Sequence, residues 1–391
     1  MTVLHGRINM NTLSLSVFII TGFLCILTYV LYPAVIWVIG RAAPFIIKRS
    51  EIQPPVSIII AAYNEEKHIE QKIINTMALD YPNDKVEILI GSDGSSDRTL
   101  DILDRYASRG IRTFNYRINR GKTSVQNDLV REANGEILIL TDAASFLSPD
   151  AIRLIVRNFA DEKVGCVAGR MVFTATDENI TTQSQGMYWK YESGIRVLES
   201  KLGRVIGVDG PLYAMRRELY IPLEPDMISD FLSPLLVLQD GNRVVLEEQA
   251  VVREEPKKRT DQEFETRRRI TLRALTALFR HPGLLNPISD TFLAFQIIAH
   301  KLLRWAVGIL VAVNLICCSM LARKLFFKII LAGYIVFFIS ALMGWCFSGK
   351  EKKIPLLSIP YYFILVNAAA TMGLIDFLRS RKATTWQTLR D

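Results

Sequence analysis

The chain has 391 residues, of which 50% are hydrophobic and 22% charged, and its formal net charge is +8. The mean hydropathy of +0.22 is high for so charged a chain, because the apolar excess lies at the two ends and the charge in the middle. The five cysteines and four histidines show no metal-ligand spacing, which argues against a disulfide framework and a zinc site. No nucleic-acid-binding motif is present, so the positive charge indicates Lys and Arg side chains facing the cytoplasm beside a membrane.

The first apolar segment, residues 13–40, contains no charged residue and is long enough to cross a bilayer with some tilt. It lacks a small-residue cleavage site, so we expect a retained transmembrane helix after an N-terminal tail, 1–12, with a kink at Pro33. Arg41, Lys48 and Arg49 follow it and predict that the next domain is cytoplasmic.

Residues 54–256 alternate between short apolar runs and helical patterns, which is typical of an α/β, Rossmann-like domain with a mostly parallel, doubly wound sheet. The predicted strands are Val56–Ala62, Val86–Gly91, Arg112–Tyr116, Gly135–Thr141 and Val164–Met171. The predicted helices are Glu65–Met77, one starting near Asp97, Lys122–Glu132 and Pro149–Phe159.

Residues 257–305 are predicted to form basic interface helices. Apolar residues interleave with arginines between Phe264 and Phe279, which fits an amphipathic helix on the cytoplasmic membrane face. The alternative is a helix packed on the domain with its basic side in water. The stretch Phe292–Trp305 is apolar but interrupted by charged side chains, so we expect it at the interface.

Three further apolar segments lie within residues 306–377, before a C-terminal tail, 378–391. Three crossings conflict with the rule that loops rich in Lys and Arg lie on the cytoplasmic side of a membrane. The lysine-rich loop Gly349–Lys353 is expected on the cytoplasmic side, yet a third crossing would then put Arg379–Lys382 outside. Either one segment is re-entrant or interfacial, or the rule fails here.

Four polar stretches follow successive predicted strands, at the edge where open α/β sheets bind ligands. They are Tyr63–Glu65, Ser92–Asp97, Asn119–Lys122 and Thr141–Asp142. Carboxylates, a glycine turn and a lysine together suit a nucleotide diphosphate bridged by Mg²⁺ or Mn²⁺. Taken alone, Asp142 is explained as well by a turn cap.

The ordered stretches VSIIIAAYNEE, ILIGSDGSSDRT, NRGKTSVQN and ILILTDAAS resemble the A-type (GT-A fold) family 2 glycosyltransferases. The resemblance continues through GVDGPLYAMRRELY, Ser229–Asp230 and RRRITLR, and so covers about Val56 to Arg273. With apolar segments at both ends, the chain is similar to the membrane-embedded branch that includes cellulose, hyaluronan and poly-N-acetylglucosamine synthases.

The resemblance implies a role for each matching residue. Asp93 would contact the nucleotide base, in a pocket lined by Ala61, Tyr63 and Glu65, while Lys122 would lie near the ribose or diphosphate. Asp97 more plausibly caps the following helix.

On the catalytic side, Asp142 would be the metal-binding carboxylate and Asp230 the base that deprotonates the acceptor. The arginines Arg267 and Arg269 would neutralise the leaving nucleotide, and Gly207, Asp209 and Gly210 would form the floor under the acceptor. Tyr188, Trp189 and Tyr191 either stack on a sugar ring or pack beside the membrane.

Three departures from the family pattern qualify these roles. Ala144 replaces the second acid of the D-x-D metal motif, and Ser229 replaces the acid that precedes the base. In the Q-x-x-R-W motif Arg269 matches the arginine, but Thr266 and Ile270 stand in place of glutamine and tryptophan. The missing tryptophan weakens the case for a processive polymerase.

The resemblance therefore implies a multi-pass protein of the plasma (inner) membrane with a cytoplasmic catalytic domain. It would transfer a sugar, with inversion, from a UDP-sugar to a polysaccharide or lipid-linked glycan acceptor in envelope or exopolysaccharide synthesis. Its partners would be the nucleotide sugar, the acceptor and membrane lipid, with no nucleic acid. One alternative is a processive synthase that also extrudes its polymer, and another is a non-catalytic nucleotide- or lipid-binding protein.

Overall fold

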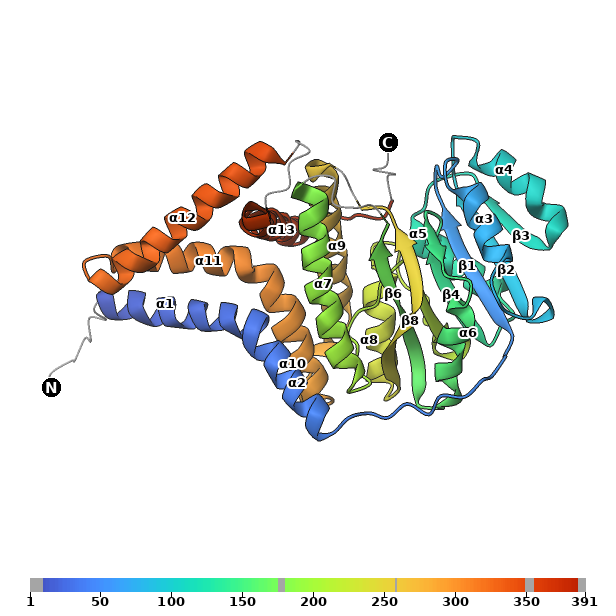
Figure 1. The fold of residues 1–391 in the computed structure, drawn as a ribbon, viewed down its shortest axis with the longest axis horizontal. Coiled ribbons are helices and arrows are strands. Elements are labelled where there is room, and N and C mark those ends of the chain that lie inside the picture. The colour runs from blue at the N-terminus through green and yellow to red at the C-terminus, as the bar shows by residue number, and fades with distance from the viewer. Residues whose placement is uncertain (1–9, 175–179, 257–258, 349–354, 386–391) are drawn as a thin grey trace.

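The computed structural model describes residues 10–174, 180–256, 259–348 and 355–385. An α/β domain lies at one end, and long apolar helices extend away from it (Figure 1). Residues 1–9 of the predicted N-terminal tail, the lysine-rich loop 349–353 and residues 386–391 of the C-terminal tail lie outside the described residues.

The domain is built on one eight-stranded sheet with the order β3-β2-β1-β4-β7-β6-β8-β5. Its strands are β1 (Val56–Ala62), β2 (Val86–Asp93), β3 (Ile111–Tyr116), β4 (Ile137–Asp142), β5 (Ser145–Leu147), β6 (Val164–Phe173), β7 (Leu212–Arg216) and β8 (Arg243–Glu254).

The predicted parallel arrangement holds for half of this sheet. Strands β3, β2, β1 and β4 are all parallel to their neighbours. Beyond β4 the sheet is mixed, because β7 runs antiparallel to both β4 and β6, and β5 runs antiparallel to β8. The strands β5, β7 and β8 lie where the sequence pattern predicted none.

Helices cover both faces of the sheet, as its apolar strands require. In β1, Ile58 and Ile60 face one core and Ile59 and Ala61 the other, because successive side chains of a strand alternate between faces. One face carries α3 (Ile69–Met77), α4 (Thr99–Tyr106) and α6 (Ala151–Val156); the other carries α5 (Lys122–Glu132), α8 (Ser229–Gln239) and part of α9 (Thr260–Arg280).

In the described part of the chain, the apolar ends form four helices that are long and apolar enough to cross a membrane. The first comprises α1 (Met10–Ile26), a π-helical turn (Leu27–Leu31) and α2 (Tyr32–Ala42), and it bends near Pro33, as predicted (Figure 1). The second comprises α10 (Thr291–Gln296), a π-helical turn (Ile297–Leu302) and α11 (Leu303–Met320). The stretch Phe292–Trp305 is thus continuous with α11 rather than a separate helix.

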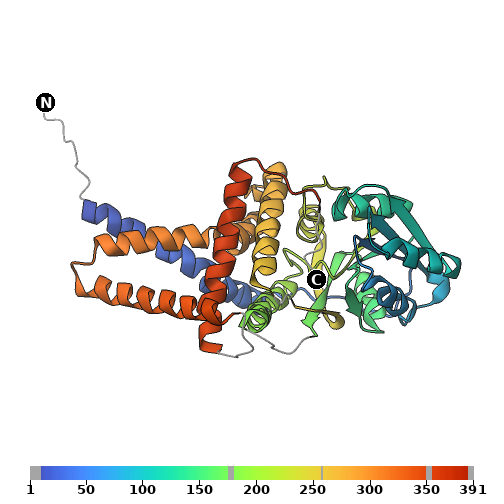
Figure 2. The same cartoon turned by 90° about the horizontal axis from the view of Figure 1, so that it is seen from above.

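The remaining long helices are α12 (Leu325–Phe347), α13 (Pro355–Leu378) and α7 (Ile180–Ser200). Figure 2 shows α13 beside α9 and across the direction of α1, α11 and α12. Helix α9 buries Leu272, Leu275 and Leu278 and contacts α13 along its length. It is therefore packed between the domain and α13, while its placement on a membrane face stays a prediction.

Candidate functional site

The parallel pairing of β1 with β2 and β4 brings three strand ends to one edge. Ala61 lies opposite Gly91 on one side and Asp142 on the other. Glu65, just beyond β1, is 8% exposed and its Oε2 lies 2.9 Å from Nδ1 of His68. Asp97 accepts hydrogen bonds from the backbone N–H groups of Thr99 and Glu66, each at 3.0 Å, and so holds the start of α4 as predicted.

Asp93 is completely buried at the end of β2. Its carboxylate accepts from the backbone N–H of Arg120 at 2.9 Å and of Gly121 at 2.8 Å. The carboxylate therefore fixes the turn that presents Lys122 at the start of α5. This is a positioning contact that the predicted role in base binding did not include.

Four groups from separate parts of the chain converge beside this turn. Nζ of Lys122 is ion-paired with Oδ1 of Asp142. A Cβ atom at Gly210 would lie 2.7 Å from Oδ2 of Asp230 and 3.5 Å from Nζ of Lys122. Because Gly210 has no side chain, Asp230, the predicted base, can lie close to Lys122 at the predicted diphosphate edge. A larger residue at this position would push against Asp230.

Asp230 lies in the first turn of α8 and is partly buried. Burial raises the pKa of its carboxyl to about 6; Lys122 opposes this rise and Asp142 adds to it. A carboxylate with a pKa near the working pH is suited to accept a proton from a hydroxyl group. Ser229 beside it donates to Oε1 of Gln126 at 2.7 Å and so anchors the start of α8.

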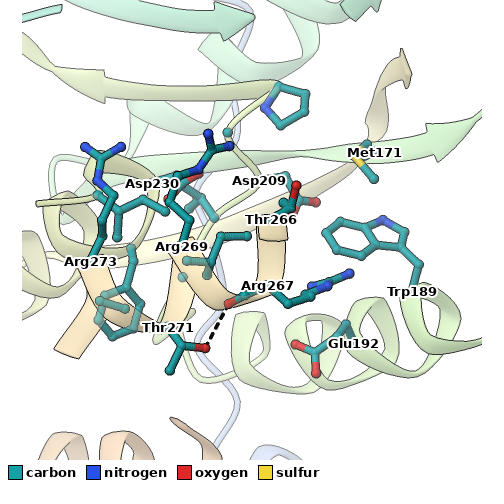
Figure 3. A pocket seen from close by; sticks show the side chains of 18 of the residues that line it. Met171, Trp189, Glu192, Asp209, Asp230, Thr266, Arg267, Arg269, Thr271 and Arg273 are labelled. Atoms are coloured by element: carbon teal, nitrogen blue, oxygen red, sulfur yellow. Dashed lines mark hydrogen bonds between the residues drawn. The ribbon is translucent and has the colours of Figure 1, made fainter. Parts of the chain in front are cut away.

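The arginines of α9 divide into two groups (Figure 3). Arg269 and Arg273 lie beside Asp230, whereas Arg267 extends toward Trp189. Arg267 is ion-paired with Glu263 at 2.8 Å and donates to the Tyr362 hydroxyl at 3.1 Å. Its charge is thus already neutralised by protein groups, so the predicted nucleotide-binding role falls more naturally to Arg269.

Arg269 makes no hydrogen bond or ion pair within the described residues, and burial lowers its pKa. Arg273 donates to Thr123 Oγ1 at 2.8 Å and to the Pro225 carbonyl at 3.0 Å, while its buried Nε has no partner among the described residues. Burial, and then the charge of Arg269, lowers the pKa of Arg273 to about 10. Both remain cations at neutral pH and favour an anion between them and Lys122.

An ion pair stabilises the segment Gly207, Asp209 and Gly210, which is predicted to form the floor under the acceptor. Asp209, 5% exposed, is ion-paired with Arg196 of α7, and Gly207 lies near Lys301. Of the three aromatic candidates, Tyr188 and Tyr191 pack against Tyr362 and the backbone of Tyr29, respectively. Tyr188 and Trp189 both line the cavity, and the buried Nε1 of Trp189 has no partner among the described residues (Figure 3).

The side chains of Lys122, Asp142, Asp209, Asp230 and the α9 arginines Arg267, Arg269 and Arg273 line one cavity of about 410 Å³, whereas Asp93 and Ala61 are not among its lining residues. It runs from Lys122 and Asp142, past Asp230 and Asp209, to Tyr29, Val366 and Ala370 on the long apolar helices. The site is therefore shared between the α/β domain and the apolar helices.

Sequence patterns missed a buried lysine under this site. Lys72 of α3 is fully buried and donates from Nζ to Thr141 Oγ1 at 2.8 Å and to the Ser145 carbonyl at 2.7 Å. Thr141 Oγ1 in turn donates to the Pro211 carbonyl at 2.7 Å, which follows Gly210. Burial lowers the pKa of Lys72 to about 7, and the charge of Asp142 counteracts part of that effect. The sequence did contain one signal for this lysine. Lys72 falls on the same side of the helix as Ile69, Ile73 and Thr76, which is the side that is buried.

The metal prediction rests on hard oxygen ligands. Asp142 and Glu254 both line the cavity, and β5 pairs Ser145 with Glu254. Among the described residues, no group of three or more His, Cys, Asp or Glu side chains can hold a metal ion. Carboxylate oxygens fit Mg²⁺ or Mn²⁺ if a diphosphate and water complete the coordination.

Comparison with known proteins identifies the domain. Residues 57–222 match the model of glycosyl transferase family 2, so the chain carries a glycosyltransferase family 2 domain of GT-A fold. The chain is 29% identical over 158 residues to a poly-beta-1,6-N-acetyl-D-glucosamine synthase of Staphylococcus epidermidis, covering 37% of this chain and 38% of that protein. It is 30% identical over 169 residues to a beta-monoglucosyldiacylglycerol synthase of Trichormus variabilis, covering 42% and 36%. The matches thus span less than two fifths of these relatives.

One solved structure resembles nearly the whole chain. It is the mannosyltransferase PcManGT from Pyrobaculum calidifontis in complex with GDP-Man and Mn²⁺. The TM-score is 0.74 at 20% identity, and the match covers 96% of this chain and 100% of that one. At this identity the likeness shows the fold, including the apolar helices.

The Lys72 contacts generate a prediction. Lys72→Met should leave the Ser145 carbonyl and Thr141 hydroxyl without their buried donor, which costs about 1–3 kcal/mol. We expect a clearly lower thermal unfolding midpoint in detergent. Lys67→Met is the matched control, because Lys67 is exposed and lies two residues before the start of the same helix. Equal midpoints for both variants would show that the ammonium does not hold this turn.

Proposed function

We propose that the protein is an inverting glycosyltransferase that moves a sugar from a nucleotide-sugar donor to a glycan or lipid-linked acceptor at the membrane surface. The observation that carries this proposal is the convergence of Asp230, Lys122 and Asp142 around Gly210 in one cavity. The sequence relatives named for polysaccharide and glycolipid synthesis support the same class of acceptor.

The reaction requires one proton acceptor and one stabilised leaving group. Asp230 takes the proton from an acceptor hydroxyl. At the same time the oxygen of that hydroxyl attacks the anomeric carbon from the side opposite the diphosphate. The bond from that carbon to the diphosphate oxygen breaks, and the electron pair leaves with the nucleotide diphosphate. Lys122, Arg269 and Arg273 supply positive charge where the leaving group gains negative charge.

A divalent cation, Mg²⁺ or Mn²⁺, would neutralise part of the diphosphate charge, with Asp142 as its protein ligand. Because Ala144 stands in place of the second D-x-D carboxylate, Asp142 would be the carboxylate beside the cation, and Lys122, its ion-pair partner, would turn to the diphosphate once the cation takes its place. Asp142 would thus bind the diphosphate end of the donor through the cation, and Lys122 would bind it through its own positive charge.

The acceptor is proposed to enter from the apolar helices. The cavity reaches Val366 and Ala370 on α13, and the Trp189 indole lines its wall. An aromatic ring whose N–H has no partner among the described residues suits a sugar ring. The apolar end of the cavity suits the lipid part of a lipid-linked acceptor.

Two alternatives remain within reach of experiment. A processive synthase would extrude a polymer between the apolar helices, and a long product rather than a single added sugar would identify it. A non-catalytic binding protein is motivated by Ala144 and Ser229. Nucleotide-sugar binding without turnover across a broad donor and acceptor panel would identify that class. Donors are found by thermal shift in detergent, because a ligand that binds the native state raises its apparent stability.

Asp230→Asn should abolish most turnover while keeping the shape of the site. General bases contribute about 10²–10⁴-fold, so we expect at least about a 100-fold loss in nucleotide diphosphate release. Donor-induced thermal shifts should persist, since the amide fills the same space. Asp240→Asn, at the exposed far end of α8, is the control. Unchanged turnover in Asp230→Asn would remove this residue as the base.

The raised pKa of Asp230 predicts a pH profile. Below about pH 6 the carboxyl is protonated and cannot accept the hydroxyl proton, so kcat/KM should fall about tenfold per pH unit and level off above pH 7. The residual rate of Asp230→Asn should lack this acidic limb. A wild-type profile that stays flat from pH 7 to pH 5 would contradict the assignment.

Asp142→Asn should weaken metal dependence specifically. Loss of the anionic ligand should raise the Mn²⁺ or Mg²⁺ concentration for half-maximal turnover by about tenfold or more. A metal titration of diphosphate release measures this, again with Asp240→Asn as the control. The same half-maximal concentration in both variants would mean that Asp142 does not bind the cation.

A further inference from the structure

A buried carboxylate behind the predicted acceptor floor, residues 207–210, joins three parts of the chain. Glu199, in the last turn of α7, is 1% exposed. Its Oε1 accepts a hydrogen bond from the Tyr32 hydroxyl and lies 2.9 Å from Nδ1 of His300. Its Oε2 accepts from the backbone N–H of Ile206 at 3.3 Å. A carboxylate removed from water needs such donors, because burial without them is costly.

Two of these donors come from the long apolar helices, next to their π-helical turns. Tyr32 is the first residue of α2 and directly follows the turn Leu27–Leu31. His300 lies within the second turn, Ile297–Leu302. The rings of Tyr32 and His300 are fully buried, and their centroids lie 5.0 Å apart. π-helical turns are rare and occur frequently at functional sites, and here both of them adjoin the same carboxylate.

The third donor leads into the floor, and the floor is bonded to the predicted base. Ile206 directly precedes the floor, and within the floor the backbone N–H of Val208 donates to the carbonyl of Asp230 at 2.9 Å. Asp209 is ion-paired with Arg196, which also belongs to α7. Helix α7 thus holds this segment at two points, Ile206 and Asp209. A shift of Ile206 would therefore be passed on to the groups around Asp230.

His300 also faces the wall of the cavity. Its Nε2 lies 3.6 Å from Oε2 of Glu192, a residue of α7 that lines the cavity. Glu192 is ion-paired with Arg304, and Nζ of Lys301 lies 3.9 Å from its Oε2. Lys301 and Arg304 both line the cavity. One stretch of the second long helix therefore contacts the carboxylate behind the floor and also contributes side chains to the cavity.

Tyr32, Glu199 and His300 lie behind the cavity. Among the residues of the described chain that line the cavity, none of these three occurs. Direct contact with a bound sugar or nucleotide therefore cannot explain an effect of changing them. Such an effect has to pass through the floor, where Glu199 holds Ile206, or through the wall, where His300 faces Glu192. A buried network of this kind sets the position of the groups that do touch a substrate.

We propose that Glu199 is a positioning residue for the acceptor, and that Tyr32 and His300 fix its carboxylate from the two long apolar helices. Through Ile206 the carboxylate holds the floor at a set place relative to those helices. A lipid-linked acceptor would have its apolar part among the helices and its hydroxyl at Asp230, so this fixed separation determines whether the hydroxyl reaches the base. The role rests on the proposed glycosyl transfer, whereas the coupling of helices to floor is a property of the folded chain.

Hydrogen exchange of the full-length protein in detergent, without any ligand, tests the coupling. Tyr32→Phe removes one donor and keeps the ring, whereas Glu199→Ala removes the acceptor of all three. We expect peptides covering residues 205–210 to exchange at least about threefold faster in Tyr32→Phe, and faster still in Glu199→Ala. Tyr334→Phe is the matched control, because the Tyr334 hydroxyl donates to Asn314 Oδ1 at 2.9 Å and joins α12 to α11 without involving Glu199. Exchange in Tyr32→Phe equal to that in the control would overturn the proposal, even if Glu199→Ala does not fold.

Kinetics separate acceptor positioning from a general loosening of the fold. Turnover is measured with a panel of UDP- and GDP-sugars as donors and with octyl β-glucoside, a sugar joined to an apolar chain, as acceptor. In Tyr32→Phe we expect the acceptor KM to rise about threefold or more, with the donor KM and the binding of UDP with Mn²⁺ unchanged. Equal rises in both KM values, or no rise in either, would contradict the positioning role. A wild-type protein without turnover would count against the proposed function alone, and the exchange comparison would still decide the coupling.

Discussion

The parallel pairing of β1 with β2 and β4 is the constraint on which the site depends. It brings three strand ends to one edge, so that Gly91 and Asp142 lie on either side of Ala61 and Asp93 follows two residues beyond Gly91. Asp93 then fixes the turn before α5, and that turn presents Lys122 to Asp142. A carboxylate and an ammonium so paired can remain charged in a partly buried cleft, where either alone would be costly.

A second set of contacts, centred on a buried cation, lies beneath this pair. The turn after β4 lacks a second carboxylate and is supported from beneath by the ammonium of Lys72. Thr141 links that ammonium to the Pro211 carbonyl, beside the acceptor floor. The end of β4 and the segment after Gly210 are thus joined through one buried hydrogen-bond network, and a change at one is expected to move the other.

The apolar helices complete the cavity and do more than anchor the domain. Residues of α11 and α13 line the same space as Asp142 and Asp230. Helix α9 couples the two parts, because Arg267 and Arg268 contact α13 while Arg269 and Arg273 lie beside the base. The packing of α13 against α9 therefore bears directly on the shape of the cavity beside Asp230.

Sequence alone determined the elements whose signal is local. The apolar run of β1, the helix Lys122–Glu132 and the order of the nucleotide-side motifs could be read because strand burial and helix periodicity leave a continuous pattern. The sequence pattern did not predict the strands β5, β7 and β8 or the helix α7, since short or polar segments acquire their structure from contacts with distant parts of the chain. Only the tertiary structure decided that Lys72 lies under the turn after β4, that Arg267 is already paired, and that α13 lies across the other apolar helices. Hydropathy records how apolar a helix is and carries no information on its direction.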